Sequence, residues 1–374
     1  MNILINASNL KAGGGLQVTE SVCGRLDAFP QHRFTVVLSS SFGPYLDRIR
    51  EWDHVRLVRH DVTNSPATLL LGRDRVLDRL VEEEGIDVVL TVFGPSRWEP
   101  RRPHLCGFAR PHLVFPESPY FSRMNGWERL KAAAFNDLLM FFFWRGTRNL
   151  YSENALVSRR VENLFKGATC HTVTNYYHQV FDNPADWTPC PLPPFEGTTL
   201  LTIGADYAHK NVGIARDVAR SLRENHPAFR FRFVLTLTEA QFPVPADLAD
   251  CFVRLGRVDI SQCPDLYRQA DIMFQPSLLE CFSATYPEAM RMGVPIVTSD
   301  LPFAQGLCGS AALYFPALDA AAAAETIYGL AQDRPRAESM AAAGELRLKE
   351  YDSYTVRAQK LIALCEQVAK DGTK

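Results

Sequence analysis

The sequence predicts an α/β fold of two domains, each built on a parallel β-sheet. Patterns typical of strands and of helices alternate from the first residues onward. The length of 374 residues is that of two ordinary domains. Residues 176–198 contain five prolines and little periodicity, which indicates a domain junction. We therefore expect a first domain over residues 1–176 and a second over residues 198–355.

Composition excludes several classes of protein. Hydrophobic residues make up 47% and charged residues 22%, the values of an ordinary soluble globular protein. The net charge of −2 does not indicate a nucleic-acid partner. Nine scattered cysteines without C-x-x-C spacing suggest reduced thiols in a cytosolic protein. We expect no signal peptide and no membrane-spanning segment, and hence a cytoplasmic location.

The first half alternates short apolar runs with amphipathic stretches. Predicted strands cover residues 3–6, 34–39, 55–58, 86–92 and 104–109, and predicted helices cover 16–26 and 69–84. Residues 151–154 open another helix, with Ser152 or Asn154 as a possible cap.

The second half repeats this alternation. Predicted strands cover residues 199–203, 231–237, 252–255, 271–275, 295–299 and 313–315. One predicted helix follows Asn211 and ends at Leu222. Further predicted helices cover residues 264–269, 287–292, 318–331 and 336–351.

The most informative stretch runs from residue 276 to residue 300. A strand ends before it, a helix begins near Ala284 and Thr285, and Gly293 stands where a helix end favours positive φ. Ligands of open parallel sheets bind at the carboxyl ends of the strands, and a helix N-terminus there can receive a phosphate. Glu280 and Glu288 flank the helix start and can accept hydrogen bonds from hydroxyl groups. Hydroxyl, phosphate and hydroxyl in this order suggest a nucleotide sugar.

The same stretch resembles the signature of retaining glycosyltransferases of family 4. Glu280, Phe282, Glu288 and Ala289 are in register with that signature, whereas Cys281 and Ser283 stand where glycines are common. The resemblance implies the GT-B fold, in which two Rossmann-like domains face each other across a cleft. It also implies that a last helix, at residues 356–374, completes the first domain. In the family the first glutamate contacts sugar hydroxyls and the second contacts the ribose.

The resemblance extends to the loop after the first strand of the second domain. Gly204, Lys210 and Asn211 match a phosphate-binding element, with Lys210 holding the donor diphosphate. Ala205 replaces the usual arginine, so a second cation would come from elsewhere, for instance from Arg257 or from the opposite domain. Gly256, Arg257 and Val258 resemble the turn that contacts the nucleobase. The remaining expected donor contacts are Cys281, Phe282, Ser283, Ala284 and Thr285.

The glycines at residues 13–15 do not form a dinucleotide fingerprint. Val18 stands at the place of the third glycine, and no acidic residue follows the second strand. They resemble the glycine-rich loop of the family, so Gly14 and Gly15 are expected near the donor phosphates or the acceptor. A simple turn that needs positive φ is the alternative.

Residues 110–119 combine prolines with His112 and Glu117 and suggest a rigid active-site loop. In the family a histidine of the first domain reaches the sugar near the reacting carbon. His112 is the candidate for this catalytic role, with His104 as a second choice, and Glu117 is a candidate for the acceptor side. The alternative is a surface histidine that only bonds the backbone.

Residues 127–144 form a helix rich in aromatic residues. Trp127, Leu130, Ala134, Leu138 and Phe141 share one face. We expect a buried helix packed on the first sheet. The alternative is contact with an anionic membrane surface, because residues 97–166 contain twelve Lys or Arg against six Asp or Glu.

Together these features predict a glycosyltransferase. The catalytic set is His112, Glu280 and Lys210, the donor is a nucleotide-diphosphate sugar, and the acceptor is a glycan or a lipid-linked oligosaccharide. Synthesis of a surface polysaccharide or lipopolysaccharide is the expected role, and a peripheral position at the inner face of the cytoplasmic membrane would suit it. No D-x-D pair is present, so transfer is expected without a metal or other cofactor. A sugar-nucleotide epimerase and a non-catalytic, membrane-docked scaffold are the alternatives.

Overall fold

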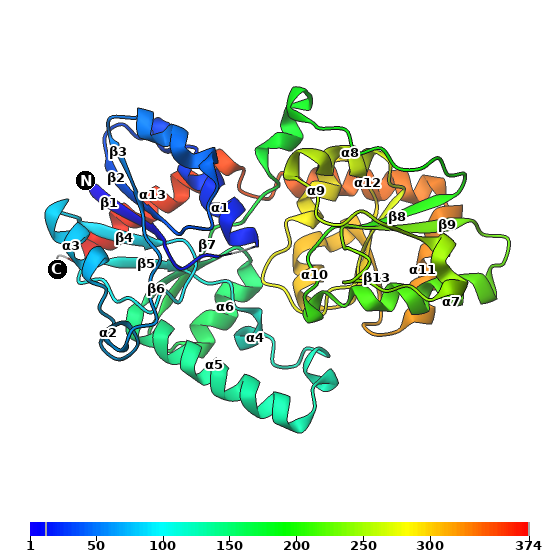
Figure 1. The fold of residues 1–374 in the computed structure, drawn as a ribbon, viewed down its shortest axis with the longest axis horizontal. Coiled ribbons are helices and arrows are strands. Elements are labelled where there is room, and N and C mark those ends of the chain that lie inside the picture. Colours follow the sequence, from blue (N-terminus) through cyan, green and yellow to red (C-terminus); the bar gives the residue numbers. More distant parts are fainter. Residues whose placement is uncertain (12, 373–374) are drawn as a thin grey trace. The chain divides into compact units, whose positions relative to one another are not determined.

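The computed structural model describes residues 1–11 and 13–372, and it divides the chain into two compact units (Figure 1). Unit 1 comprises Met1–Val114, Asn125–Asn175 and Asp352–Lys374. Unit 2 comprises Phe115–Met124 and Tyr176–Tyr351. The short segment Phe115–Met124, which we call the strap, thus belongs to unit 2 although it lies in the first half of the sequence.

Unit 1 is built on a seven-stranded parallel sheet with the order β3-β2-β1-β4-β5-β6-β7. Its strands are β1 (Asn2–Ala7), β2 (Arg33–Leu38), β3 (Val55–Arg59), β4 (Val88–Thr91), β5 (His104–Gly107), β6 (Asn149–Ser152) and β7 (Thr169–Thr172). The five strands predicted in this half are confirmed, with every end within two residues of its predicted place. The sequence patterns did not reveal β6 and β7.

The last helix, α13 (Tyr354–Asp371), packs on the sheet of unit 1. Leu361, Ile362 and Cys365 are buried in the same core as Ile3 and Ile5 of β1. Burying a Leu or Ile side chain stabilises a fold by roughly 1.5–3 kcal/mol, so this contact holds the end of the chain to its beginning. Residues 373–374 of the predicted helix lie outside the described residues.

The other helices of unit 1 follow their caps. They are α1 (Gly14–Cys23), α2 (Pro66–Leu71), α3 (Arg75–Glu83), α4 (Pro111–Val114), α5 (Gly126–Gly146) and α6 (Ala155–Leu164). The single helix predicted at residues 69–84 is wrong, because Gly72 adopts φ 66° and ends α2. Asp74 then caps α3 by accepting hydrogen bonds from the backbone N–H groups of Val76 and Leu77. The predicted Asn154 cap of α6 is confirmed.

Helix α5 is not the buried helix that we expected. The side chains exposed along it include Trp127 (64%), Leu130 (60%), Phe135 (50%), Leu138 (46%), Phe141 (46%) and Trp144 (56%). Only its last two turns are anchored, where Leu139, Phe142 and Phe143 are buried. The apolar face read from the sequence is real, but it faces away from the core.

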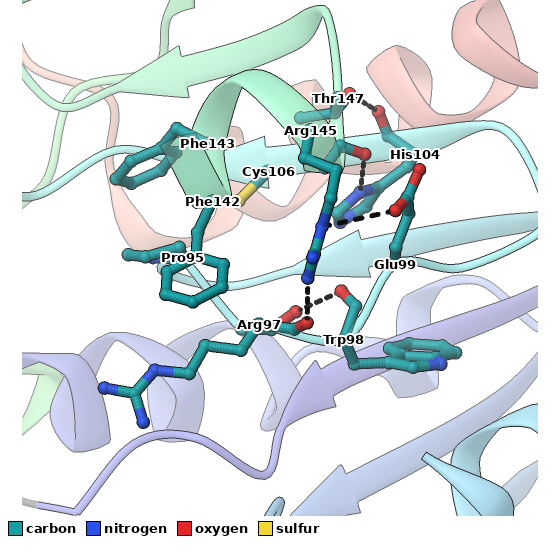
Figure 2. Close-up of a pocket in the computed structure, with 12 residues that line it drawn as sticks. Pro95, Arg97, Trp98, Glu99, His104, Cys106, Phe142, Phe143, Arg145 and Thr147 are labelled. Carbon is teal, nitrogen blue, oxygen red and sulfur yellow. Dashed lines mark hydrogen bonds and ion pairs between the residues drawn. The ribbon is translucent and has the colours of Figure 1, made fainter. Parts of the chain in front are cut away.

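Arg145 anchors this end of α5 to the rest of unit 1 (Figure 2). Its guanidinium donates hydrogen bonds to the carbonyl oxygens of Leu69 (3.1 Å), Leu70 (3.2 Å) and Arg97 (2.9 Å). His104 Nδ1 lies 3.0 Å from the Gly146 carbonyl oxygen, and burial lowers the pKa of His104 to about 4. Burial thus favours the neutral imidazole of His104 within β5, and its place as second choice for the catalytic histidine stays a prediction.

Unit 2 is built on a six-stranded parallel sheet with the order β10-β9-β8-β11-β12-β13. Its strands are β8 (Thr198–Thr202), β9 (Phe231–Leu235), β10 (Phe252–Arg254), β11 (Ile272–Gln275), β12 (Ile296–Ser299) and β13 (Ala312–Phe315). Its helices are α7 (Ala215–Asn225), α8 (Cys263–Arg268), α9 (Thr285–Arg291), α10 (Pro302–Cys308), α11 (Ala320–Gln332) and α12 (Arg334–Leu348). All six predicted strands are confirmed.

The strand order of unit 2 reverses direction between β8 and β11. From β8 the chain adds β9 and β10 on one side, and from β11 it adds β12 and β13 on the other. Such a switch point opens a crevice at the carboxyl ends of the two central strands, which is where ligands of open α/β sheets bind. The fold therefore places the loops that follow β8 and β11 at the edge expected to hold a ligand.

Candidate active site

Lys210 and Glu280 lie on the two loops that meet at this switch point. Lys210 follows β8, and Glu280 follows β11. The two strands are paired in parallel, with Leu201 opposite Met273, so their loops leave the sheet side by side. The backbone N–H of Leu278 donates a 2.8 Å hydrogen bond to the carbonyl oxygen of His209, which ties one loop to the other.

The ammonium group of Lys210 forms an ion pair with the carboxylate of Glu280. Both side chains are largely shielded, with exposed fractions of 16% and 10%. A charge in such a place needs its partner, because an uncompensated buried charge costs several kcal/mol. The pair therefore places one cation and one hydrogen-bond acceptor at the sheet edge, where each could bind a ligand in place of its present partner.

Glu288 lies close to this pair, in the first turn of α9. Its carboxyl is buried and accepts a 3.2 Å hydrogen bond from the hydroxyl of Tyr267 on α8. Burial raises the pKa of Glu288 to about 7, against the opposing effects of the Tyr267 hydrogen bond and of the Lys210 charge. The structure thus brings Lys210, Glu280 and Glu288 into one electrostatic neighbourhood.

A network of buried polar side chains shapes the loop between the two glutamates. Gln275 Nε2 donates to the hydroxyls of Ser277 (3.0 Å) and Ser283 (3.4 Å), and Ser283 Oγ lies 3.0 Å from Thr285 Oγ1. Cys281 and Ser283, which replace the glycines common in the family, are themselves buried. Both side chains therefore lie in the protein interior.

The strap covers the β8 and β11 loops from within unit 2. The hydroxyl of Ser118 donates a 2.6 Å hydrogen bond to the carbonyl oxygen of Leu278. The ring of Tyr120 lies edge-on to His209, with centroids 6.3 Å apart. Arg123 Nη1 donates a hydrogen bond to Oδ1 of Asn211. Arg123 and Tyr267 are site residues that the sequence analysis missed, since no local motif marks either of them.

The other predicted donor residues of unit 2 are spread along the same sheet edge. Gly204 donates its backbone N–H to Oγ1 of Thr236 at 2.9 Å. Ala284 precedes the first residue of α9, and the ring of Phe282 lies 5.9 Å from that of Tyr351. Arg257, which is exposed, and Val258 follow β10. Glu117 is exposed on the strap.

Three predicted residues lie in unit 1. Gly14 and Gly15 open α1 at the carboxyl end of β1, and His112 lies in the short helix α4. Gly13, directly before α1, adopts φ 77°, which agrees with a turn that needs glycine. The roles expected for Gly14, Gly15, His112 and Glu117 stay predictions.

Within residues 1–11 and 13–372 no group of three or more His, Cys, Asp or Glu is placed to hold a metal ion. No helix of this part of the chain has the length and apolarity that crossing a bilayer requires.

Comparison with known proteins finds similarity to glycosyltransferases. Residues 197–333 match the family described as glycosyl transferases group 1. The phosphatidyl-myo-inositol mannosyltransferase of Mycobacterium leprae is 29% identical over 186 residues, which are 48% of this chain. The chain matches half of the length of that mannosyltransferase, since the aligned region covers 50% of it.

Solved structures with this architecture match nearly the whole chain. Sucrose-phosphate synthase of Thermosynechococcus elongatus has a TM-score of 0.72 at 15% identity, covering 99% of both chains. WaaG, a glycosyltransferase of lipopolysaccharide biosynthesis, has a TM-score of 0.68 at 13% identity, covering 97% of this chain and 99% of its own. HepE of Anabaena, in complex with UDP and glucose, has a TM-score of 0.66 at 14% identity, covering 97% and 98%. The chain therefore has the GT-B fold, and its second unit matches the glycosyl transferases of group 1.

Proposed function

We propose that the protein is a glycosyltransferase that moves a sugar from a nucleotide-diphosphate sugar to a glycan or lipid-linked acceptor. One observation carries the proposal: Lys210, Glu280 and Glu288 converge at the switch point of the sheet in unit 2. The group 1 family match lies over the same unit, and HepE, with the same fold, was solved with UDP and glucose. We propose a surface polysaccharide or lipopolysaccharide as the product, which the likeness to WaaG supports.

In this proposal the donor exchanges partners with the ion pair. The leaving group is a nucleoside diphosphate, so negative charge grows on its β-phosphate as the bond to the sugar breaks. Lys210 turns from Glu280 to this phosphate and stabilises the growing charge. The released carboxylate of Glu280 accepts hydrogen bonds from sugar hydroxyls. We propose that transfer proceeds with retention, as the resemblance to family 4 implies, and without a metal ion, since the sequence contains no D-x-D pair.

Glu288 holds the nucleoside end of the donor. Its buried carboxyl already accepts a hydrogen bond from Tyr267, which orients it. Hydroxyls of the ribose add further hydrogen bonds to the ionised form, and these favour ionisation in the complex. The resemblance to family 4 further implies a catalytic role for His112, and Glu117 is proposed for the acceptor side.

The experiment combines a nucleotide screen with two variants. The wild type is melted with UDP, GDP, dTDP and ADP, and at ~100 times its dissociation constant a bound nucleotide adds about 2.7 kcal/mol to stability. The corresponding sugar nucleotides are then offered with candidate acceptors. Lys210→Ala and Glu288→Ala should each lower transfer about ten-fold or more, whereas Lys349→Ala, an exposed lysine on unit 2, should not.

The same assay separates transfer from the alternatives. An epimer formed from the sugar nucleotide without acceptor would show an epimerase, and a wild type that binds none of the four nucleotides would fit a scaffold. Wild-type transfer rates in both the Lys210 and the Glu288 variant would contradict the assigned site.

We also propose that the exposed face of α5 contacts an anionic membrane surface. The exposed Leu70 and Leu71 of α2 continue the apolar face, since Arg145 of α5 bonds the Leu70 carbonyl oxygen. Basic groups accompany the two terminal tryptophans: the ammonium of Lys131 lies 5.1 Å from the ring centroid of Trp127, and the guanidinium of Arg148 lies 5.0 Å from that of Trp144. Aromatic rings beside cations suit the interface of an anionic bilayer and would bring the enzyme to a lipid-linked acceptor.

Sedimentation with lipid vesicles tests this surface. We expect the wild type to bind vesicles that contain anionic phosphatidylglycerol and to bind vesicles of phosphatidylcholine much less. Trp127→Glu with Trp144→Glu should abolish binding, and Leu346→Glu, which changes an exposed leucine of α12, should leave it intact. Equal binding by the double variant and the wild type would contradict the proposal.

A further inference from the structure

The loop that follows β8 contributes a single permanent cation to the candidate site. Lys210 is that cation, and residues 205–208 before it are exposed and carry no positive charge. His209 does not add a second charge, because burial lowers the pKa of its imidazole below the ordinary value. A diphosphate that leaves bulk water needs charge-assisted hydrogen bonds on several oxygens. One cation of this loop cannot supply charge-assisted hydrogen bonds to all of these oxygens.

The strap brings a second permanent cation to this loop. Phe115 packs edge-on against Phe303 with a centroid distance of 6.2 Å, and Ser118 is hydrogen-bonded to Leu278. These contacts fix the strap before it reaches the turn that contains Arg123. The guanidinium of Arg123 then donates to the side chain of Asn211, the residue directly after Lys210. Arg123 is distant in sequence from the loop but lies against it in space.

The side chain of Asn211, next to Lys210, has one polar group that can bind a ligand. The backbone of Asn211 adopts the left-handed conformation with φ 52°, and the residue is only 6% exposed. Its Oδ1 accepts the hydrogen bond from Arg123, whereas its buried Nδ2 has no hydrogen-bond partner among residues 1–11 and 13–372. Buried donors are nearly always satisfied in native proteins, so an acceptor oxygen from outside the chain is the expected partner.

We propose that Arg123 supplies the second cation for the diphosphate of the donor, acting together with Lys210 and with Nδ2 of Asn211. This inference rests on the proposed function of the site. A guanidinium carries five N–H donors in a planar fork that matches phosphate oxygens, more than a single amide oxygen can accept. Arg123 thereby supplies the positive charge that is missing at Ala205, where the family usually has an arginine.

Arg257, the replacement that the sequence suggests, is placed less well. It follows β10, which is separated from β8 by β9. Neighbouring strands lie roughly 4.8 Å apart, so Arg257 leaves the sheet about 10 Å from the strand that leads to Lys210. It is also exposed, whereas Arg123 is already bonded to the residue next to Lys210.

Calorimetric titration of the full chain tests the inference. The probes are whichever of UDP, GDP, dTDP and ADP binds the wild type most tightly, and the corresponding monophosphate. Arg123→Met should raise the dissociation constant of the diphosphate about ten-fold or more, and that of the monophosphate much less, because a lost charge-assisted hydrogen bond acts on the phosphates. Arg123→Lys should retain part of the affinity. Arg230→Met removes an exposed arginine that directly precedes β9, at the opposite sheet edge, and should bind as the wild type does.

The possible outcomes separate this inference from the proposed function. If Lys210→Met weakens binding and Arg123→Met does not, the site stands and the inference is overturned. Equal losses for diphosphate and monophosphate in Arg123→Met would show a merely structural role and would also overturn it. A loss in Arg257→Met alone would assign the second cation to Arg257. If no nucleotide binds the wild type, the proposed function falls and the inference with it.

Discussion

Replacing Glu288 by glutamine should remove a pH dependence of stability that its burial creates. Burial raises the pKa of Glu288 from 4.5 to about 7 in the folded protein. Above pH 4.5 the unfolded chain releases this proton while the folded protein retains it, so the folded state loses stability as pH rises. Each pKa unit corresponds to about 1.4 kcal/mol, and the total loss is about 3 kcal/mol, most of it between pH 5 and pH 8.

The measurement compares the wild type with Glu288→Gln at pH 5 and pH 8. Urea unfolding is monitored by pulsed hydrogen exchange in peptides covering residues 272–299, which report on unit 2 alone. This restriction matters because two units need not unfold together. Between these pH values the free energy of unfolding of Glu288→Gln should rise by about 2–3 kcal/mol relative to the wild type. Glu153 of unit 1, whose pKa burial also raises to about 7, is present in both proteins and cancels.

Glu345→Gln serves as the matched control, because Glu345 is an exposed carboxylate of α12 in the same unit. It should follow the wild type at both pH values. If Glu288→Gln also runs parallel to the wild type, Glu288 is not buried as the structure has it, and the reasoning about its charge is refuted.

Three other changes test the contacts around the site and the join between the chain ends. Tyr267→Phe removes the hydroxyl that donates to Glu288, and since this hydrogen bond lowers the pKa of Glu288, the loss of stability should move to higher pH in the same unfolding experiment; an unmoved midpoint would count against the contact. Lys210→Met leaves the carboxylate of Glu280 without its cation and should cost unit 2 about 3 kcal/mol in urea unfolding, most of which the double variant Lys210→Met with Glu280→Gln should recover; no recovery would argue against the pair. Leu361→Ala, at a position 1% exposed in the core of unit 1, should destabilise that unit by about 3 kcal/mol without weakening nucleotide binding, and a loss confined to unit 2 would contradict the placement of α13.

Much of the fold follows from patterns that are local in sequence. The predicted strands, such as β4 and β11, are runs of apolar, often β-branched residues that are buried on both faces of a sheet. Such runs are visible in the sequence. Strands β6 and β7 escaped because NLYS and TCHT are short and largely polar. Their partners in the sheet, and not their own composition, make them strands.

Helix α5 shows the limit of periodicity. The sequence defines an apolar face through Trp127, Leu130 and Leu138, but periodicity does not say whether that face meets a core or the solvent. The tertiary structure decides this, because only the end near Phe142 and Phe143 packs against unit 1. The Gly72 break between α2 and α3 is a local signal that the apolar pattern of residues 69–84 outweighed.

The site divides in the same way. Lys210, Glu280 and Glu288 stand in motifs, and the parallel pairing of β8 with β11 brings their loops together as expected of a switch point. Tyr267 and Arg123 could not be found from the sequence. Tyr267 reaches Glu288 from α8, and Arg123 reaches Asn211 across 88 positions of the chain. Contacts of this kind depend on packing, for which a single sequence contains no pattern.

Binding of a nucleoside diphosphate to the candidate site tests the central claim most directly. In calorimetric titrations of the wild type and of Lys210→Met with UDP, GDP, dTDP and ADP, we expect one diphosphate to bind the wild type and to lose about ten-fold or more in affinity in the variant. Failure of all four to bind the wild type, or equal affinity in the two proteins, would contradict the account.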